Sequence, residues 1–458
     1  MNIDFKAIRT IDGKASTGFE ELVCQLAALE PVPGGARFHR KGTGKDGGLE
    51  CFTRFSDGTE CGWQAKYSWR FDHNLERSLH SSVKSALKKH PNLTKIFVCL
   101  PFDRSDPFST NETQLEAFER WRNKEVAEAA KQDRQLEIDL WDASALKTKL
   151  TNPSGHHAGR IRYWFESQFL SPGWFQDQFE RSKAALGHRY THETSVKIPI
   201  RRALLGATRY PELLTSLRNH RNDLREACNE FQTAFVLSDE DANTMSALGE
   251  LLDDVDELPH QAWPVDHWRN VLGQGLDIVE RKYHDEIRET YSTSSDEEKT
   301  KKNQVYDARH ALEKLERVSA TLRARAWEMA VIPHMLITGE AGSGKSHLLA
   351  DACSHQLNKK RPAVLLLGGQ LNDAEIWPQI LNQLGLPLHY TRDQFLGALD
   401  AAGEAAGVRT MLCIDAINER NGGEVWPSRF AAFLKDAEAY PNVVVVLSCR
   451  STALLHKS

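Results

Sequence analysis

The sequence reads His334-Met-Leu-Ile-Thr-Gly-Glu-Ala-Gly-Ser-Gly-Lys-Ser346 where an apolar run passes into a glycine-rich loop, and a helical pattern follows at residues 347–357. The loop matches G-x-x-x-x-G-K-[ST], and a strand before it and a helix after it are the context that a phosphate-binding loop requires. Glycines let the backbone turn so that N–H groups face phosphate oxygens, and the helix N-terminus adds partial positive charge. The residues expected to contact a nucleotide are Gly339, Gly342, Ser343, Gly344, Lys345 and Ser346.

Two further side chains should complete this site. A second apolar run ends at Asp415, where a carboxylate can hold Mg²⁺ opposite the Ser346 hydroxyl while Lys345 holds the β- and γ-phosphates of ATP. Glu419 is placed to orient the attacking water. The simpler interpretations are a strand-end cap for Asp415 and a structural position for Glu419.

A third apolar run, 443–447, is followed by Arg450, which could contact the γ-phosphate or serve a structural role only. Together with the runs 364–367 and 411–414, it forms a series of nearly continuous apolar segments separated by helical patterns. Such a series predicts a parallel sheet buried on both faces. We therefore expect an open α/β sheet of at least four strands within residues 331–458.

The chain has 458 residues, a formal net charge of −5 and 26% charged residues. This length exceeds one ordinary domain of roughly 100–200 residues, so several domains are expected. The sequence has no apolar stretch long enough for a membrane span, and its eight scattered cysteines indicate reduced thiols in a cytoplasmic protein. The negative charge leaves the basic segment 37–54 as the local candidate for nucleic-acid contact, and a solvated loop is an equally good interpretation of it.

The fold class expected is α/β multidomain, in three parts. Residues 1–150 alternate helical and strand-like patterns and predict a mixed α/β domain. Residues 151–330 predict a mostly helical connector, which opens with crowded aromatic residues at 164–175 that are typical of a packed domain junction. Residues 331–458 hold the parallel sheet. The strands expected in the first part lie near residues 49–52, 61–67, 96–100 and 136–141.

A second candidate site lies in the first part. Glu50 is followed, after thirteen intervening residues, by Gln64-Ala-Lys66 in a strand-like run. Side chains alternate along a strand, so Gln64 and Lys66 share a face. The Glu50 and Gln64 oxygens could bind a divalent cation, and Lys66 could stabilise the negative charge that develops when a phosphodiester is hydrolysed. Glycines 47 and 48 would let the substrate backbone approach.

The block Ile-Asp415-Ala-Ile-Asn-Glu419, together with Trp426 and Leu-Ser-Cys-Arg450-Ser, resembles the NTPase core of STAND proteins, particularly the antiviral Avs group. The resemblance covers about residues 330–452. It implies an ATP-dependent switch that forms a homo-oligomer, a tetramer, after sensing a trigger. Relatives often have a small residue where this chain has Arg420. The segment Leu-Gly-His-Arg-Tyr-Thr-His192-Glu is similar to a stretch of the same group, with His192 in place of a proline.

The blocks Asp46-Gly-Gly-Leu-Glu50 and Gly-Trp-Gln64-Ala-Lys66-Tyr, behind a helix that includes Glu20, resemble PD-(D/E)xK nucleases of the Mrr-like kind, including effector domains fused to Avs-type NTPases. The resemblance covers roughly residues 15–150. It implies metal-ligand roles for Glu50 and Gln64, a catalytic role for Lys66 and participation of Glu20. Glu50 stands where many relatives have Asp, and Gln64 replaces the charged acid of the namesake motif. Asp46 could be catalytic or form a turn, and Glu20 could be a surface helix position.

These resemblances imply ATP-dependent antiviral defence, in which trigger sensing drives oligomerisation and activates Mg²⁺-dependent cleavage of double-stranded DNA. The expected trigger is a phage protein that binds a C-terminal sensor, because the chain resembles a STAND NTPase that is incomplete at its C-terminus. No membrane partner is expected. Two alternatives stay open: a signalling switch whose N-terminal domain holds nucleic acid without cleaving it, and a DNA-restriction or repair ATPase.

Overall fold

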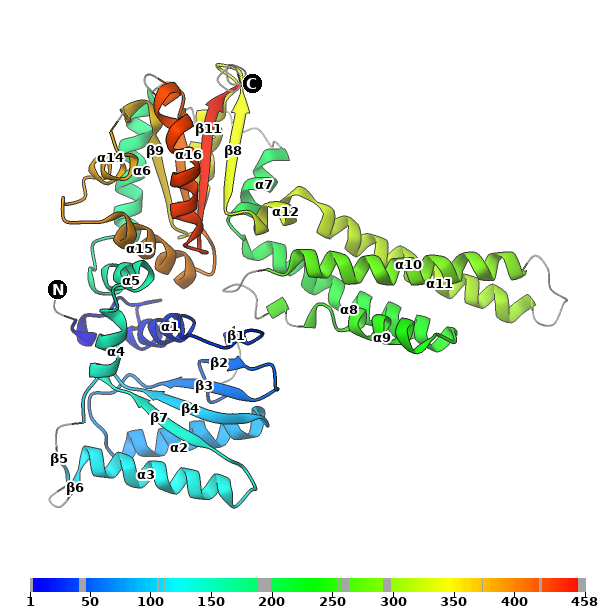
Figure 1. Ribbon diagram of the computed structural model, residues 1–458, viewed down its shortest axis with the longest axis horizontal. Coiled ribbons are helices and arrows are strands. Elements are labelled where there is room, and N and C mark those ends of the chain that lie inside the picture. The colour runs from blue at the N-terminus through cyan, green and yellow to red at the C-terminus, as the bar shows by residue number, and fades with distance from the viewer. Residues whose placement is uncertain are drawn as a thin grey trace.

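The chain is an α/β multidomain protein with one mixed and one parallel sheet. Figure 1 shows the two sheets at opposite ends of a column, with short helices between them and a long helical arm projecting from the side. None of the described helices combines the length and the apolar composition needed to cross a bilayer. The computed structural model describes residues 3–40, 47–104, 107–109, 112–187, 199–253, 255–256, 263–290, 298–372, 374–419 and 422–451.

The N-terminal sheet has five strands in the order β1-β2-β3-β4-β7. β2 pairs antiparallel with both β1 and β3, whereas β4 pairs parallel with both β3 and β7. The four expected strands are confirmed close to their predicted positions. β1 was not predicted, because its sequence Arg-Phe-His-Arg carries two arginines and resembles a basic loop. The strands are β1 (Arg37–Arg40), β2 (Cys51–Arg54), β3 (Glu60–Ala65), β4 (Leu93–Cys99) and β7 (Glu137–Trp141).

Helices cover both faces of this sheet. On one face α1 (Ala15–Ala27) packs its buried Phe19 and Leu22 against Trp63 and other strand residues. On the other face lie α2 (His73–Lys89) and α3 (Gln114–Ala130). Asp72 caps α2 by accepting hydrogen bonds from the backbone N–H groups of the first turn, as expected for an N-cap carboxylate. The remaining N-terminal elements are η1 (Phe5–Ala7), β5 (Pro107–Ser109), β6 (Glu112–Thr113) and α4 (Ala143–Leu150).

The second sheet has four parallel strands in the order β8-β11-β10-β9, so the expected parallel sheet is confirmed. Alternate strand residues enter two separate cores, one under α14 to α16 and the other under α6, α7 and α13. The strands are β8 (His334–Gly339), β9 (Ala363–Leu367), β10 (Thr410–Asp415) and β11 (Val443–Arg450). The helices are α6 (Pro172–Leu186), α7 (Pro199–Ala207), α13 (Lys345–Asn358), α14 (Ile376–Gln383), α15 (Arg392–Ala405) and α16 (Gly422–Glu438), with a short η5 (Gly368–Gln370).

The crowded aromatic residues form the junction between the two sheet domains, as predicted. Trp164 in α5 (Gly155–Phe165) donates its Nε1–H to Gln25 of α1, at 3.0 Å. Phe165 meets Phe5 edge-to-face with ring centroids 5.6 Å apart, and Phe169 meets Tyr390 at 5.1 Å. A single apolar core therefore runs from α1 through α5 to α15.

The projecting arm has an apolar core of its own, formed mainly by four helices. These are α8 (Pro211–Ala234), α9 (Asp239–Gly249), α10 (Val265–Thr290) and α11 (Glu298–Arg323), and α12 (Arg325–Val331) leads from the arm to β8. Buried Arg409 anchors the root of the arm, since its guanidinium donates to the carbonyl oxygens of Ile332 at 3.0 Å and Pro441 at 3.1 Å. Its backbone N–H donates to Thr208 at 2.9 Å.

Candidate functional site

The carboxyl ends of the parallel strands gather the residues predicted from the glycine-rich loop. Parallel strands end at one edge of a sheet, and ligands of open α/β sheets bind at that edge. Gly339 at the end of β8 pairs with Arg450 at the end of β11. A cleft of about 280 Å³ opens beside them. Its lining includes the other expected residues, namely Gly342, Ser343, Gly344, Lys345, Ser346, Asp415, Glu419 and Arg450.

The glycine-rich loop, residues 339–346, is held by its own lysine. Lys345 Nζ donates to the carbonyl oxygens of Gly339 at 2.8 Å and Glu340 at 2.7 Å, and to Ser343 Oγ at 3.1 Å. Gly344 has φ +84°, a left-handed conformation that favours glycine, and α13 begins at the next residue. The helix N-terminus and the lysine ammonium thus share one cleft, an arrangement suited to an anion.

Asp415 is buried at the end of β10 and is oriented by the neighbouring strand. Ser448 of β11 donates its hydroxyl to Asp415 Oδ1 at 2.5 Å and accepts from the Ala416 N–H at 2.8 Å. Asp415 Oδ2 has no hydrogen-bond partner among the described residues. An unpartnered carboxylate oxygen in the same cleft as the Ser346 hydroxyl fits a Mg²⁺ ion, which prefers oxygen ligands.

The role of Ser448 is not predicted by the motif. In the sequence, Ser448 is visible only as a polar residue directly after an apolar run. In the structure, Ile414 pairs with Leu447, so the next residues of the two strands, Asp415 and Ser448, are neighbours. Only the pairing of these strands reveals that the serine faces Asp415. Strand register depends on contacts between distant segments, so the sequence pattern alone leaves it open.

Glu419 and Arg450 lie together at the rim of the cleft. Arg450 NH2 is 3.5 Å from Glu419 Oε1, and the Arg450 backbone N–H donates to Asn418 Oδ1 at 2.9 Å. The Arg450 side chain is 48% exposed. The two residues predicted to orient water and to contact the γ-phosphate are therefore neighbours, and a bound nucleotide could compete for the arginine.

The N-terminal candidate site brings Glu50 and Gln64 together. Gln64 Nε2 donates to Glu50 Oε1 at 2.8 Å, and the Glu50 backbone N–H donates to Trp63 at 2.8 Å. Gln64 is 3% exposed, whereas Glu50 is partly exposed. Two oxygen-bearing side chains, one near the end of β3 and one directly before β2, fit the start of a divalent-cation site. A cation there would require the Gln64 amide to turn its oxygen toward Glu50.

The remaining residues named in the sequence analysis are either partly exposed or lie outside the described residues. Lys66 directly follows β3 and is partly exposed, with its backbone N–H donating to Cys99 at 3.0 Å. Glu20 lies on α1 and is also partly exposed. Asp46, Thr191, His192 and Arg420 lie outside the described residues. Within the part of the chain that the structure describes, no three His, Cys, Asp or Glu side chains cluster closely enough to hold a metal ion.

The structure gives Gly48 a different role from the one predicted. A Cβ atom at Gly48 would lie 2.1 Å from the Ser82 carbonyl oxygen and 2.6 Å from the Ala86 nitrogen, both in α2. Its φ of +84° also favours glycine. The close approach that requires this glycine is thus to the protein's own helix, so the expectation that it admits a substrate backbone is wrong for Gly48.

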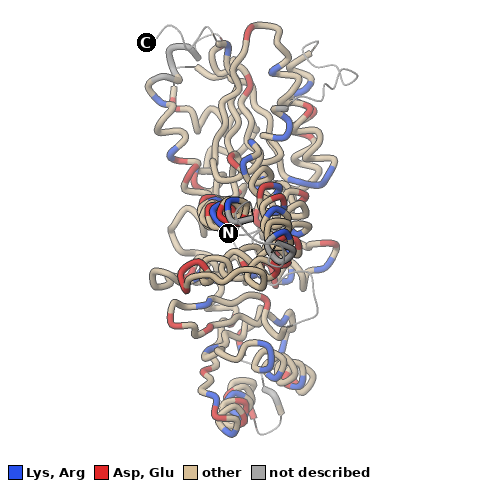
Figure 2. The backbone as a smooth tube through the Cα atoms, turned by 90° about the vertical axis from the view of Figure 1, so that its right-hand side faces the viewer, with Lys and Arg blue, Asp and Glu red and all other residues tan. Residues whose placement is uncertain are grey.

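The described basic residues of the segment 37–54 differ in their exposure to solvent. Arg40 is only 5% exposed and contacts two carboxylates, whereas Arg37 and Arg54 are exposed. Figure 2 shows charged residues of both signs interspersed over helices and loops along the whole molecule. Burial removes Arg40 from any contact with nucleic acid. Lys41 and Lys45 lie outside the described residues.

A larger hollow lies elsewhere on the N-terminal domain. It has a volume of about 740 Å³ and lies over β3 and β4, where Trp63 and Phe97 stack with ring centroids 5.5 Å apart. Lys95 and Glu137 stand at its margin. None of the predicted site residues that the structure describes is among the residues that line this hollow.

Neither a scan against protein-family models nor a search of curated proteins returns a match to this chain.

Proposed function

We propose that the chain is a nucleotide-regulated nuclease of antiviral defence, with an ATP site at the edge of the parallel sheet and a metal-dependent DNA-cleaving site in the N-terminal domain. The observation that carries the proposal is the cleft at residues 339–346, where Lys345, Ser346 and Asp415 converge. These three residue types at the carboxyl edge of a parallel sheet are the parts of a P-loop NTPase site.

Each residue of the cleft would have its own role when ATP binds. Lys345 would exchange its contacts with the Gly339 and Glu340 carbonyl oxygens for phosphate oxygens. Ser346 and Asp415 would hold Mg²⁺, which neutralises charge on the phosphates when it is bound. The Ser448 hydroxyl keeps the Asp415 carboxylate in one orientation for this task.

Arg450 would respond to the γ-phosphate. Its guanidinium lies 3.5 Å from Glu419, so a phosphate group that attracts Arg450 would draw this cation away from the carboxylate that is proposed to orient a water. Such an exchange distinguishes ATP from ADP, because only ATP presents the additional charge. The position of the Arg450 side chain at the rim of the cleft would in this way depend on whether ATP or ADP is bound.

The N-terminal site would hydrolyse a phosphodiester of double-stranded DNA. Glu50 and Gln64 would hold Mg²⁺, and Lys66 would stabilise the negative charge that develops on the phosphate. Water supplies the hydroxyl group to phosphorus and a proton to the leaving oxygen. The 2.8 Å contact between Gln64 and Glu50 supports this assignment because it places both oxygen-bearing side chains at one point.

Oligomerisation into a tetramer and a phage-protein trigger belong to the same proposal. Their support is the sequence resemblance to Avs-type STAND proteins and the helical arm, which carries its own core and extends from the column. In this scheme a trigger would bring several N-terminal domains together on DNA.

Plasmid nicking tests the nuclease. Wild-type protein with Mg²⁺ and ATP should convert supercoiled plasmid to nicked and linear forms, and Lys66→Gln should slow this by about 100-fold or more, as for loss of one group that stabilises transition-state charge. Lys147→Gln, at an exposed position of α4, is the matched control and should cut like wild type. Equal rates for Lys66→Gln and wild type would overturn the assignment.

A second candidate function is a switch that binds nucleic acid without cutting it. The observation in its favour is that Gln64 donates to Glu50, which leaves the described site with one carboxylate and an amide. DNA binding by wild type together with no nicking in Mg²⁺ or Mn²⁺ would support this candidate over the nuclease.

A further inference from the structure

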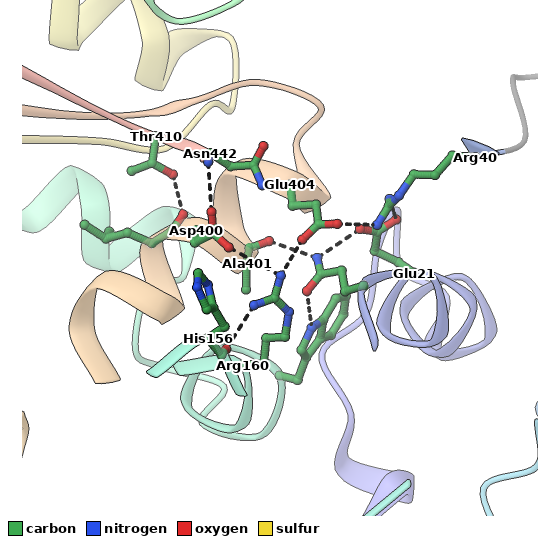
Figure 3. Close-up of polar contacts among 12 residues, drawn as sticks. Glu21, Arg40, His156, Arg160, Asp400, Ala401, Glu404, Thr410 and Asn442 are labelled. Atoms are coloured by element: carbon green, nitrogen blue, oxygen red, sulfur yellow. Dashed lines mark hydrogen bonds and ion pairs between the residues drawn. The ribbon is translucent and has the colours of Figure 1, made fainter. Parts of the chain in front are cut away.

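A cluster of buried charges joins the two sheet domains where α1, β1, α5 and α15 meet (Figure 3). Arg40 contacts Glu21 at 2.6 Å and Glu404 at 2.8 Å, and Arg160 contacts Glu404 at 2.7 Å and Asp400 at 3.3 Å. We call these five residues the junction cluster. Glu404 is its centre, because it is the carboxylate that contacts both arginines.

On the N-terminal side, the cluster reaches the Glu50–Gln64 site through strand register. Arg40 is the last residue of β1 and pairs with Cys51 of β2, the residue that directly follows Glu50. Cys51 in turn pairs with Trp63, the residue before Gln64. A displacement of Arg40 would therefore move the start of β2, which Glu50 directly precedes.

On the other side, the cluster is tied to the parallel sheet. Asp400 accepts a hydrogen bond from the Asn442 N–H at 2.8 Å, and the Leu399 carbonyl accepts from the Thr410 hydroxyl at 2.7 Å. Thr410 begins β10 and Asn442 directly precedes β11. The same two strands end at the residues of the nucleotide cleft.

The cluster is costly to bury, which argues against a purely stabilising role. It holds three carboxylates and two guanidinium groups, and desolvation raises the pKa of Glu21 and of Asp400. Replacing buried ion pairs by apolar residues is often neutral or stabilising, whereas removing one partner leaves an uncompensated charge. The apolar core around α5 and α15 already joins the domains. In some proteins, buried polar or ionic groups instead fix one geometry between the parts that they connect.

We propose that Glu404 is a positioning residue for the Glu50–Gln64 site, acting through Arg40 across the domain junction. The parallel-sheet domain thereby fixes β1 and β2 in the arrangement that the N-terminal site needs. The inference rests on the proposed nuclease function where DNA cleavage is measured. The measurement of amide hydrogen exchange in β2 does not depend on that function.

Glu404→Gln is the variant that tests this role in the full chain. It keeps the side-chain volume and leaves two arginines facing the two remaining carboxylates, so the folded state should persist. Glu125→Gln is the matched control, because Glu125 is equally buried at 4% exposure and lies 2.8 Å from His80, on the face of the N-terminal sheet away from the junction. Arg40→Lys is a second variant, which keeps the charge but loses the fork that bridges two carboxylates.

Amide hydrogen exchange is the structural readout. Exchange in β2 should be at least about threefold faster in Glu404→Gln and in Arg40→Lys than in wild type. Each substitution removes contacts of Arg40, which pairs with β2, so local opening of β2 should cost less free energy. Glu125→Gln should leave β2 unchanged. If Glu404→Gln folds and its β2 exchanges at the wild-type rate, the inference is overturned. If Glu404→Gln does not fold, a wild-type exchange rate in β2 of Arg40→Lys overturns it. Neither outcome depends on whether the protein cuts DNA.

Plasmid nicking is the second readout. Glu404→Gln should reduce the rate at saturating DNA and Mg²⁺ by about tenfold or more with little change in DNA affinity, because misplaced groups lower the chemical step. If wild type does not cut while β2 exchanges faster in Glu404→Gln, the proposed nuclease fails and the positioning role stands. If wild type cuts and Glu404→Gln cuts equally fast, the positioning role fails and the nuclease stands.

Discussion

Ser448 donates a 2.5 Å hydrogen bond to Asp415 across the pair of strands β11 and β10. Both residues are almost fully buried, and both line the cleft at residues 339–346. The Ser448 hydroxyl is thus a neutral donor that orients this buried carboxylate. It also means that the candidate Mg²⁺ ligand is oriented by a residue that lies 33 positions away in the sequence.

Ser448→Ala should destabilise the protein and weaken Mg²⁺-dependent nucleotide binding. Asp415 Oδ1 would lose its donor while remaining buried, which costs about 1–3 kcal/mol of unfolding free energy. Urea unfolding and titration with Mg²⁺ and ATP measure the two effects. Ser319→Ala is the control, since Ser319 is buried in α11 of the arm, away from the cleft. Indistinguishable nucleotide affinities for the two variants would count against the role of Ser448.

Gly159→Ala should disrupt the crossing of α5 and α15. A Cβ atom at Gly159 would lie 2.2 Å from the Gly397 carbonyl carbon and 2.3 Å from the Ala398 nitrogen, which is backbone that cannot rotate away. We expect a loss of about 1–3 kcal/mol in unfolding free energy from the forced backbone shift.

Gly273→Ala is the matched control for this substitution. Gly273 also lies within a helix, α10, but a Cβ atom there meets nothing within 4 Å. Alanine should therefore raise stability by up to about 1 kcal/mol through helix propensity. The prediction fails if both variants shift the urea midpoint in the same direction.

His157 should make the protein less stable as the pH falls below neutrality. Burial, followed by the charge of Arg160, lowers the pKa of His157 to about 4. Between its ordinary pKa near 6.5 and this value, the unfolded chain binds a proton that the folded chain does not, so stability is present above pH 6.5 and is lost toward pH 4. Acidification in this window favours unfolding.

The variant His157→Gln isolates this effect from the carboxylates that titrate in the same range. Its melting temperature should fall less between pH 7 and pH 5 than that of wild type, because the titrating group is gone. His389→Gln, at an exposed position, should keep the wild-type pH dependence. The same pH dependence in wild type and His157→Gln would refute the assignment.

The sequence predicts those parts of the fold whose determinants are local. The apolar runs that become β9, β10 and β11, and the loop at residues 339–346, are visible because each pattern lies within one short segment. The determinants of α2 are likewise local, because its buried residues Leu75, Leu79 and Val83 recur at spacings of four and Asp72 caps its first turn.

The missed features depend on partners that are distant along the chain. Arg40 looks like part of a basic loop until Glu404 is found beside it, 364 residues away in the sequence. Gly48 looks like a substrate-facing glycine until α2 is seen to pack against it. Buried ion pairs and close backbone approaches follow from tertiary packing, which no local pattern encodes.

Calorimetric titration of ATP with Mg²⁺ into the full chain asks whether the cleft at residues 339–346 binds a nucleotide, the property on which the proposed function depends. Wild type should bind one ATP per chain, and Lys345→Ala should bind at least about tenfold more weakly, since it removes charged hydrogen bonds to phosphate. Lys359→Ala, exposed beyond the end of α13, should bind like wild type. No binding of ATP by folded wild type, or equal binding by Lys345→Ala, would contradict the account.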